Sequence, residues 1–226
     1  RILTNFNGSF DAVDTLAHEL GHAYHGTQTC SHRILNRDYP MQVAETASTF
    51  NETHITCLAI AKATGEEKLA LLDNILMNTT QVICDIYSRF LFEDSVFNAC
   101  EDRFLMPEDL KAMMLDAQKK AYGDGLDPEY MHPYMWACKG HYYSEALSYY
   151  NFPYAFGAML AMGLYSMYLK EGEAFLPKYN KFLHATTVMS VEDTAAVVGI
   201  DLTSKDFWRE SLKSFADMID EFVELT

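Results

Sequence analysis

The sequence is short of positive charge. Its 226 residues include 17 lysines and arginines against 32 aspartates and glutamates, so the formal net charge is −15. A surface with this balance repels nucleic-acid phosphates and anionic lipid headgroups. We therefore expect neither nucleic acid nor a membrane as a partner. The usual consequence of such acidity is solubility, and it mildly favours cationic or neutral substrates.

Signatures of several other protein classes are also missing. The sequence contains no internal repeat, low-complexity tract or phosphate-binding loop, and no apolar run long enough to span a bilayer. No secretory signal precedes the first predicted helix, and the five cysteines include no Cys-x-x-Cys pair. These absences favour reduced thiols and a cytoplasmic location. Because the chain begins at Arg1 rather than at a methionine, we expect it to be part of a longer protein.

Hydrophobic periodicity is the main positive signal. Hydrophobic residues make up 49% of the chain and charged residues 22%, a composition typical of a globular domain. Apolar residues recur every three or four positions through most of the chain, which predicts a mainly α fold. Residues 1–7 instead alternate apolar and polar, which predicts a short strand. Helices are expected over about 9–26, 40–62, 66–100 with a bend near 78–80, 107–123, 150–170 and three stretches after 175.

One motif carries specific chemistry, and it reads His18-Glu19-Leu20-Gly21-His22. Histidines four residues apart on a helix lie about 40° from each other on one face, so both imidazoles can hold one metal ion. Glu19 projects from a neighbouring part of the same surface, where it can take a proton from a metal-bound water. The motif predicts a zinc site with Glu19 as general base.

A third ligand is expected on the next predicted helix, which Pro40 opens. Glu45 and Glu52 are seven residues apart, so on one helix they lie about 20° from alignment. Two carboxylates on an otherwise apolar helix need partners. We expect Glu45 to complete a His, His, Glu zinc site with an open fourth position, and Glu52 to hydrogen-bond a ligating imidazole. The alternative is that one or both form a solvated face.

An irregular stretch, 123–150, carries His141 and leads into a cluster of tyrosines. Tyr150 and Tyr154 are four residues apart near the start of a predicted helix, so their hydroxyls can face the same way. A phenol is a neutral donor that can stabilise the oxyanion formed when water adds to a peptide carbonyl. Taken alone, such aromatic clusters more often belong to a core.

Together these residues resemble the oligoendopeptidase F and thimet oligopeptidase family of zinc metallopeptidases, and most of all its bacterial oligoendopeptidase F branch. The resemblance implies that residues 1–226 form a mainly α, zincin-like catalytic domain, the C-terminal part of a longer chain. It implies an active site deep in a channel that admits short peptides. It also implies these site residues: His18, His22 and Glu45 as ligands of one Zn²⁺, Glu19 as base, Glu52 in support, and His141, Tyr150 and Tyr154 in contact with substrate and the tetrahedral intermediate. The main oxyanion donor stays open among Tyr149, Tyr150 and Tyr154.

We therefore expect a zinc endopeptidase that cleaves oligopeptides, with short peptides and the N-terminal half of the same protein as partners. The predicted strand at residues 1–7 could pair with a substrate backbone. One alternative is a zinc carboxypeptidase on a related helical scaffold, although the sequence offers no unambiguous arginine to bind a substrate's terminal carboxylate. Another is a non-catalytic peptide-binding or structural zinc domain, whose metal site would be closed by four protein ligands.

Overall fold

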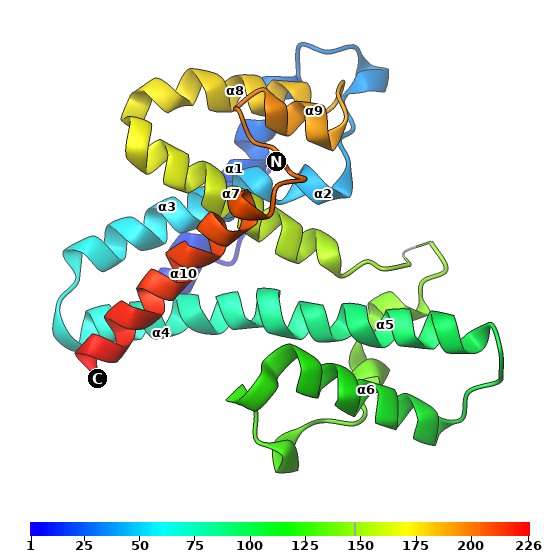
Figure 1. The fold of residues 1–226 in the computed structure, drawn as a ribbon. Coiled ribbons are helices and arrows are strands. Elements are labelled where there is room, and N and C mark those ends of the chain that lie inside the picture. Colours follow the sequence, from blue (N-terminus) through cyan, green and yellow to red (C-terminus); the bar gives the residue numbers. More distant parts are fainter. Residues whose placement is uncertain (147) are drawn as a thin grey trace. The chain divides into compact units, whose positions relative to one another are not determined.

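A computed structural model describes residues 1–146 and 148–226. Within these residues the chain is helical and contains no β-strand, which confirms the predicted mainly α fold. The chain divides into two compact units (Figure 1). Unit 1 comprises Arg1–Leu76 and Phe156–Thr226, and unit 2 comprises Met77–Ala155. In the described part of the chain, no helix is both long and apolar enough to span a membrane.

Unit 1 begins with helix α1 (Phe10–Thr29), which carries the predicted metal motif. The hydroxyl of Ser9 caps this helix by accepting a hydrogen bond of 3.2 Å from the backbone N–H of Ala12. Helix α1 packs against α3 (Thr46–Lys62). This pairing places the histidines of α1 beside the carboxylates that precede and belong to α3.

Two predictions about the first thirty residues are wrong. Gly26 does not end α1, and the helix runs through it to Thr29. An interior glycine weakens a helix by about 1 kcal/mol without breaking it. Residues 1–7 form no strand, since within the described residues no second strand is present to pair with them.

The helix predicted over residues 40–62 is in fact two helices, α2 (Met41–Ala44) and α3. The break between them falls at Glu45, whose backbone has φ −90° and ψ 1°. This is the sparsely allowed bridge region of backbone conformation, where many active-site residues sit. The predicted alignment of Glu45 with Glu52 along one helix therefore does not apply.

The rest of unit 1 supplies most of its core. Its helices are the first part of α4 (Gly65–Thr80), α7 (Phe152–Glu171) from residue 156 onward, α8 (Leu176–Ala185), α9 (Val191–Ala196) and α10 (Lys205–Leu225). The ring of Phe50 on α3 stacks on Tyr179 of α8, with centroids 4.6 Å apart. Large apolar side chains from α7, α8 and the turn between them are fully buried, namely Leu160, Leu164, Phe175, Phe182 and Leu183. Helix α8 also packs against α1, so this core supports the helix that carries the metal motif.

Unit 2 is built on a pair of helices, α5 (Ile86–Cys100) and α6 (Pro107–Tyr122), which lie side by side in Figure 1. A π-helical turn, Gln81–Asp85, joins α4 to α5, so the irregularity falls just after the bend predicted near 78–80. Buried Phe92 packs with Met114 and Ala117 between the two helices. Short 3-10 turns follow α6 through the predicted irregular stretch, at Gly123–Gly125, Pro128–Tyr130, Met135–Cys138 and Gly140–Tyr143.

Candidate metal centre and active site

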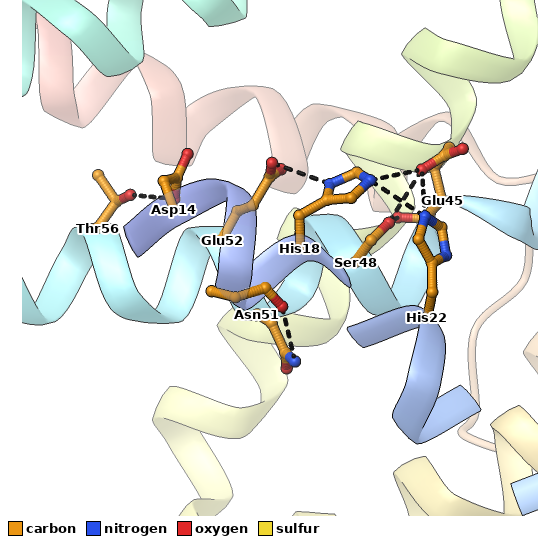
Figure 2. Close-up of polar contacts among 9 residues, drawn as sticks. Asp14, His18, His22, Glu45, Ser48, Asn51, Glu52 and Thr56 are labelled. Carbon is orange, nitrogen blue, oxygen red and sulfur yellow. Dashed lines mark hydrogen bonds and ion pairs between the residues drawn. The ribbon is translucent and has the colours of Figure 1, made fainter. Parts of the chain in front are cut away.

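Three side chains of unit 1 converge on one point, as Figure 2 shows. Nε2 of His18 lies 3.1 Å from Nε2 of His22. Oε2 of Glu45 lies 3.4 Å from each of these nitrogens. The two imidazoles come from successive turns of α1, and the carboxylate comes from the break between α2 and α3.

The spacing of these three atoms fits a zinc ion. Zinc ligands lie about 2.0–2.1 Å from the metal in a tetrahedron, so any two of them are about 3.3 Å apart. The observed separations of 3.1, 3.4 and 3.4 Å form a triangle of this size. Two nitrogens and one carboxylate oxygen are also the donor types that zinc accepts at catalytic sites. A fourth corner of the tetrahedron is left without a protein ligand among the described residues.

Glu52 orients the first histidine. Its Oε1 lies 2.9 Å from Nδ1 of His18, and a carboxylate can only accept, so Nδ1–H is the donor. In the neutral ring this leaves the lone pair on Nε2, which faces His22 and Glu45. A carboxylate behind a ligating histidine is the usual way in which proteins fix the ring's tautomer and direction.

The electrostatics of the cluster favour a positive charge at its centre. Hydrogen bonds with Glu45 and Glu52 raise the pKa of His18 to about 10, against the opposing effect of burial. The pKa of Glu45 lies far below its usual range because His18 and His22 hydrogen-bond its carboxylate. A proton or a metal cation can supply this charge, so the two compete for the same position.

Neighbouring groups hold Glu45 in place. The hydroxyl of Ser48 lies within hydrogen-bond distance of both Oε2 of Glu45 (3.0 Å) and its backbone carbonyl (2.9 Å). On the other side, buried Gly157 of α7 faces the Cβ atom of Glu45, and a methyl group there would lie 3.4 Å from it. Glu45 is therefore confined by its own helix start and by α7.

Glu19 follows His18 on α1 and is half-buried. Within the described part of the chain, its carboxylate makes no hydrogen bond and no ion pair. One residue along a helix is a rotation of about 100°, so Glu19 lies beside the face that carries the two histidines. Its carboxylate is thus available to a molecule bound at that face.

Two further polar residues of α1 lie near the motif, His25 and Asp14. His25 is fully buried, with Nε2 2.8 Å from the hydroxyl of Thr186 and its ring stacked on Tyr39 at 4.1 Å. His25 therefore supports the packing of unit 1 rather than the metal cluster.

Asp14 lies one turn before His18 on α1, and sequence reasoning did not identify it. Burial and the charge of Glu52 raise the pKa of Asp14 to about 6.

Unit 2 brings together the predicted substrate-contacting residues. The ring of His141 lies 5.2 Å from that of Tyr150 and 6.1 Å from that of Tyr154, measured between centroids. The two tyrosine rings meet edge to face at 5.5 Å. Tyr150 precedes α7, whereas Tyr154 lies in its first turn. The prediction that both tyrosines lie on one helix is therefore wrong for Tyr150. Their roles stay predictions.

Sequence reasoning missed two further residues of unit 2. Glu93 and Asn151 are buried, and one oxygen of Glu93 accepts a hydrogen bond of 2.6 Å from the side-chain amide of Asn151. The sequence signal that could have identified Glu93 is a carboxylate on an otherwise apolar helix, because such a group needs partners. Glu93 was not recognised because it falls within the apolar periodicity of α5.

Solved structures share this fold. The chain aligns with oligoendopeptidase-F from Enterococcus faecium with a TM-score of 0.79, covering 95% of this chain and 39% of that one. It also aligns with a Chlamydophila abortus protein described as a peptidase, with a TM-score of 0.87 over 98% of this chain and 37% of that one. Both are 22% identical in sequence, so the likeness concerns the fold.

Sequence comparison identifies the family. Residues 1–214 match the family model described as Peptidase family M3. Oligopeptidase PepF from Bacillus subtilis (strain 168) is 30% identical over 99% of this chain and 33% of its own length. The chromosomal oligoendopeptidase F of Lactococcus lactis subsp. cremoris is 27% identical over 99% of this chain and 37% of its own. The chain belongs to peptidase family M3, which confirms the resemblance, and it spans about a third of the length of these curated relatives.

Proposed function

We propose that this chain is the catalytic part of a zinc endopeptidase that hydrolyses peptide bonds within short oligopeptides. One observation carries the proposal, namely the convergence of His18, His22 and Glu45 at the spacing of tetrahedral zinc ligands. Membership of peptidase family M3 supports the reaction class. The names of the relatives, oligopeptidase and oligoendopeptidase, support the substrate class and the internal cleavage.

In this proposal each residue of the cluster has a separate task. His18, His22 and Glu45 hold one zinc ion per chain, and Glu52 keeps the Nε2 lone pair of His18 directed at it. When bound, zinc supplies a Lewis acid that polarises the substrate carbonyl and lowers the pKa of a water molecule beside it.

Proton transfer belongs to Glu19. Its carboxylate takes a proton from the attacking water as general base and then donates it to the amine of the leaving peptide. The absence of any hydrogen bond or ion pair to Glu19 within the described residues supports this role, since a base must be free to accept. His141, Tyr150 and Tyr154 are assigned to the substrate and to the oxyanion, which a phenol can stabilise as a neutral donor.

The proposal also concerns the whole protein. Residues 1–226 act as the catalytic domain of a longer chain, and the remainder of that chain completes the substrate-binding site. Relatives about three times as long as this chain support the second statement.

An internally quenched peptide tests the proposal in the full-length protein. We expect cleavage that a zinc chelator abolishes and that added zinc restores. A peptide with a blocked C-terminus should be cleaved as well as an unblocked one, because an endopeptidase does not require a terminal carboxylate. Cleavage that persists in the chelator would refute zinc dependence, and a strict need for the free carboxylate would instead indicate a carboxypeptidase.

A further inference from the structure

The turn that leads into α7 contains a strained residue. Tyr149 has φ 56°, and among the described residues it is the one non-glycine residue with a positive φ. For a residue with a Cβ atom this left-handed conformation costs about 1–2 kcal/mol. Such a conformation persists only where the surrounding structure holds it.

Helix α5 holds it through a buried carboxylate. Glu93 is 7% exposed, and its Oε1 accepts a hydrogen bond of 2.7 Å from the backbone N–H of Tyr149. Its Oε2 accepts one of 2.6 Å from the side-chain amide of Asn151. Both partners can only donate, so both oxygens of Glu93 are committed as acceptors.

The side chain of Tyr149 is anchored by the same face of α5. Its hydroxyl donates to Oδ1 of Asp94 at 3.0 Å. Its ring lies between Phe90 and Phe97, with centroids 5.6 and 5.3 Å away. These residues and Glu93 occur at positions i, i+3, i+4 and i+7, which form one stripe of a helix.

Asn151 connects this anchor to the start of α7. Its side-chain oxygen accepts a hydrogen bond of 2.6 Å from the N–H of Phe152, the first residue of the helix. Its backbone carbonyl accepts one of 3.2 Å from the N–H of Tyr154. Tyr150 lies between the two residues that Glu93 holds, so the backbone on both sides of it is fixed.

We infer that Glu93 is a positioning residue for the tyrosine pair of the active site, acting through the 149–151 turn. Its carboxylate holds the turn in a conformation that Tyr149 would otherwise leave, and this directs Tyr150 and Tyr154. The inference rests on the proposed function, in which these tyrosines meet the oxyanion. Glu93 is not one of the three residues of the metal cluster, so the assignments made for that cluster give it no role.

A swap of the two partners tests the inference in the full-length protein. In Glu93→Gln an amide N–H₂ faces the side-chain N–H₂ of Asn151. Both groups are donors, so the hydrogen bond between residues 93 and 151 is lost. Asn151→Asp places two carboxylates in contact. The double variant Glu93→Gln/Asn151→Asp restores one donor and one acceptor at the same total charge. Asp94→Asn is the matched control, because its amide oxygen can still accept from Tyr149.

We expect each single variant to lose about 10²-fold in kcat for the quenched peptide with little change in KM and with zinc content intact. The double variant should recover most of this loss, and Asp94→Asn should stay close to wild type. Wild-type kcat in Glu93→Gln would overturn the inference. So would a double variant no better than the worse single one, including one that fails to fold.

A second measurement separates this inference from the proposed function. Hydrogen exchange at the Tyr149 amide should be slow in the wild type, faster in Glu93→Gln and slow again in the double variant. This expectation does not depend on which reaction the protein catalyses. Fast exchange in the wild type would overturn the hydrogen bond itself. If exchange follows this pattern while the wild type shows no chelator-sensitive cleavage, the proposed function fails and the turn's support by Glu93 stands.

Discussion

Gly21 of α1 lies directly against the backbone of Ala47 in α3. A Cβ atom at Gly21 would lie 2.7 Å from the carbonyl carbon of Ala47 and closer still to its oxygen. Cβ atoms in proteins do not approach backbone so closely, so the two helices can cross here only because residue 21 is glycine. The crossing lies within one helical turn of His18 and His22, and it therefore sets the distance between the histidines and Glu45.

Replacement of Gly21 by alanine should push α1 away from α3. Because the obstruction is backbone rather than a flexible side chain, we expect a loss of about 3 kcal/mol or more in the free energy of unfolding, together with weaker zinc binding. Thermal unfolding and metal analysis of the full-length protein measure both. Gly26→Ala is the matched control, since Gly26 is on the same helix with nothing within 4 Å of its would-be Cβ. That variant should gain about 0.5–1 kcal/mol, and equal behaviour of the two would refute the close crossing.

Removal of Glu45 should affect zinc more than removal of Glu52. Glu45→Ala takes away a donor atom, whereas Glu52→Ala takes away only the group that orients His18. Loss of such an orienting group typically costs about 10–100-fold in metal affinity, and loss of the ligand should exceed this. Zinc stoichiometry after dialysis and competition with a chelating dye measure the two affinities. Unchanged zinc binding in Glu45→Ala would show that the third ligand lies elsewhere.

Glu19→Gln should separate metal binding from catalysis. The amide keeps the size of the side chain but cannot accept the proton, so we expect kcat to fall by about 10²–10⁴-fold. Zinc content should match the wild type, because Glu19 is not among the converging donors. Turnover near the wild-type rate would remove Glu19 from the role of base.

Acid should destabilise unit 1 through His25. Burial lowers the pKa of His25 to about 4, opposed by a backbone hydrogen bond. Between pH 6.5 and pH 4 the unfolded chain therefore binds a proton that the folded chain excludes. The stability that neutral His25 provides is complete above pH 6.5 and is lost progressively as the pH falls toward 4.

The expected loss between pH 7 and pH 5 is about 2 kcal/mol from this residue alone. Chemical unfolding of the metal-free full-length protein at both pH values measures it. His25→Gln keeps a donor for Thr186 but has no titrating ring, so its stability should change less over the same interval. A variant with the same pH dependence as the wild type would show that another group is responsible.

The metal motif could be predicted from sequence because its geometry is local. His18 and His22 are one helical turn apart, and helix α1 alone brings their rings together. The sequence predicts Glu45 and Glu52 as partners of this motif because it places them on one continuous helix. That basis is wrong, since α2 ends before Glu45 and α3 begins after it. Both carboxylates nevertheless meet His18, one at each ring nitrogen, because the break at Glu45 turns its side chain back toward α1.

The residues that sequence reasoning missed depend on contacts between distant segments. Glu93 and Asn151 are 58 residues apart. This pair does not have a spacing that a helix or turn makes recognisable. The positive φ of Tyr149 is equally hidden, because a glycine would be expected at such a position and its tolerance of tyrosine comes from α5.

The sequence by itself determined the helical class, the family and the residue types of the candidate site, since these follow from periodicity and from spacings within one or two helical turns. The tertiary structure decided the rest. It allowed α1 and α3 to cross at Gly21, broke the second helix at Glu45 and made Glu93 the support of the tyrosine turn. Each of these depends on which backbone comes within a few ångströms of which other, and packing of the whole chain decides that distance.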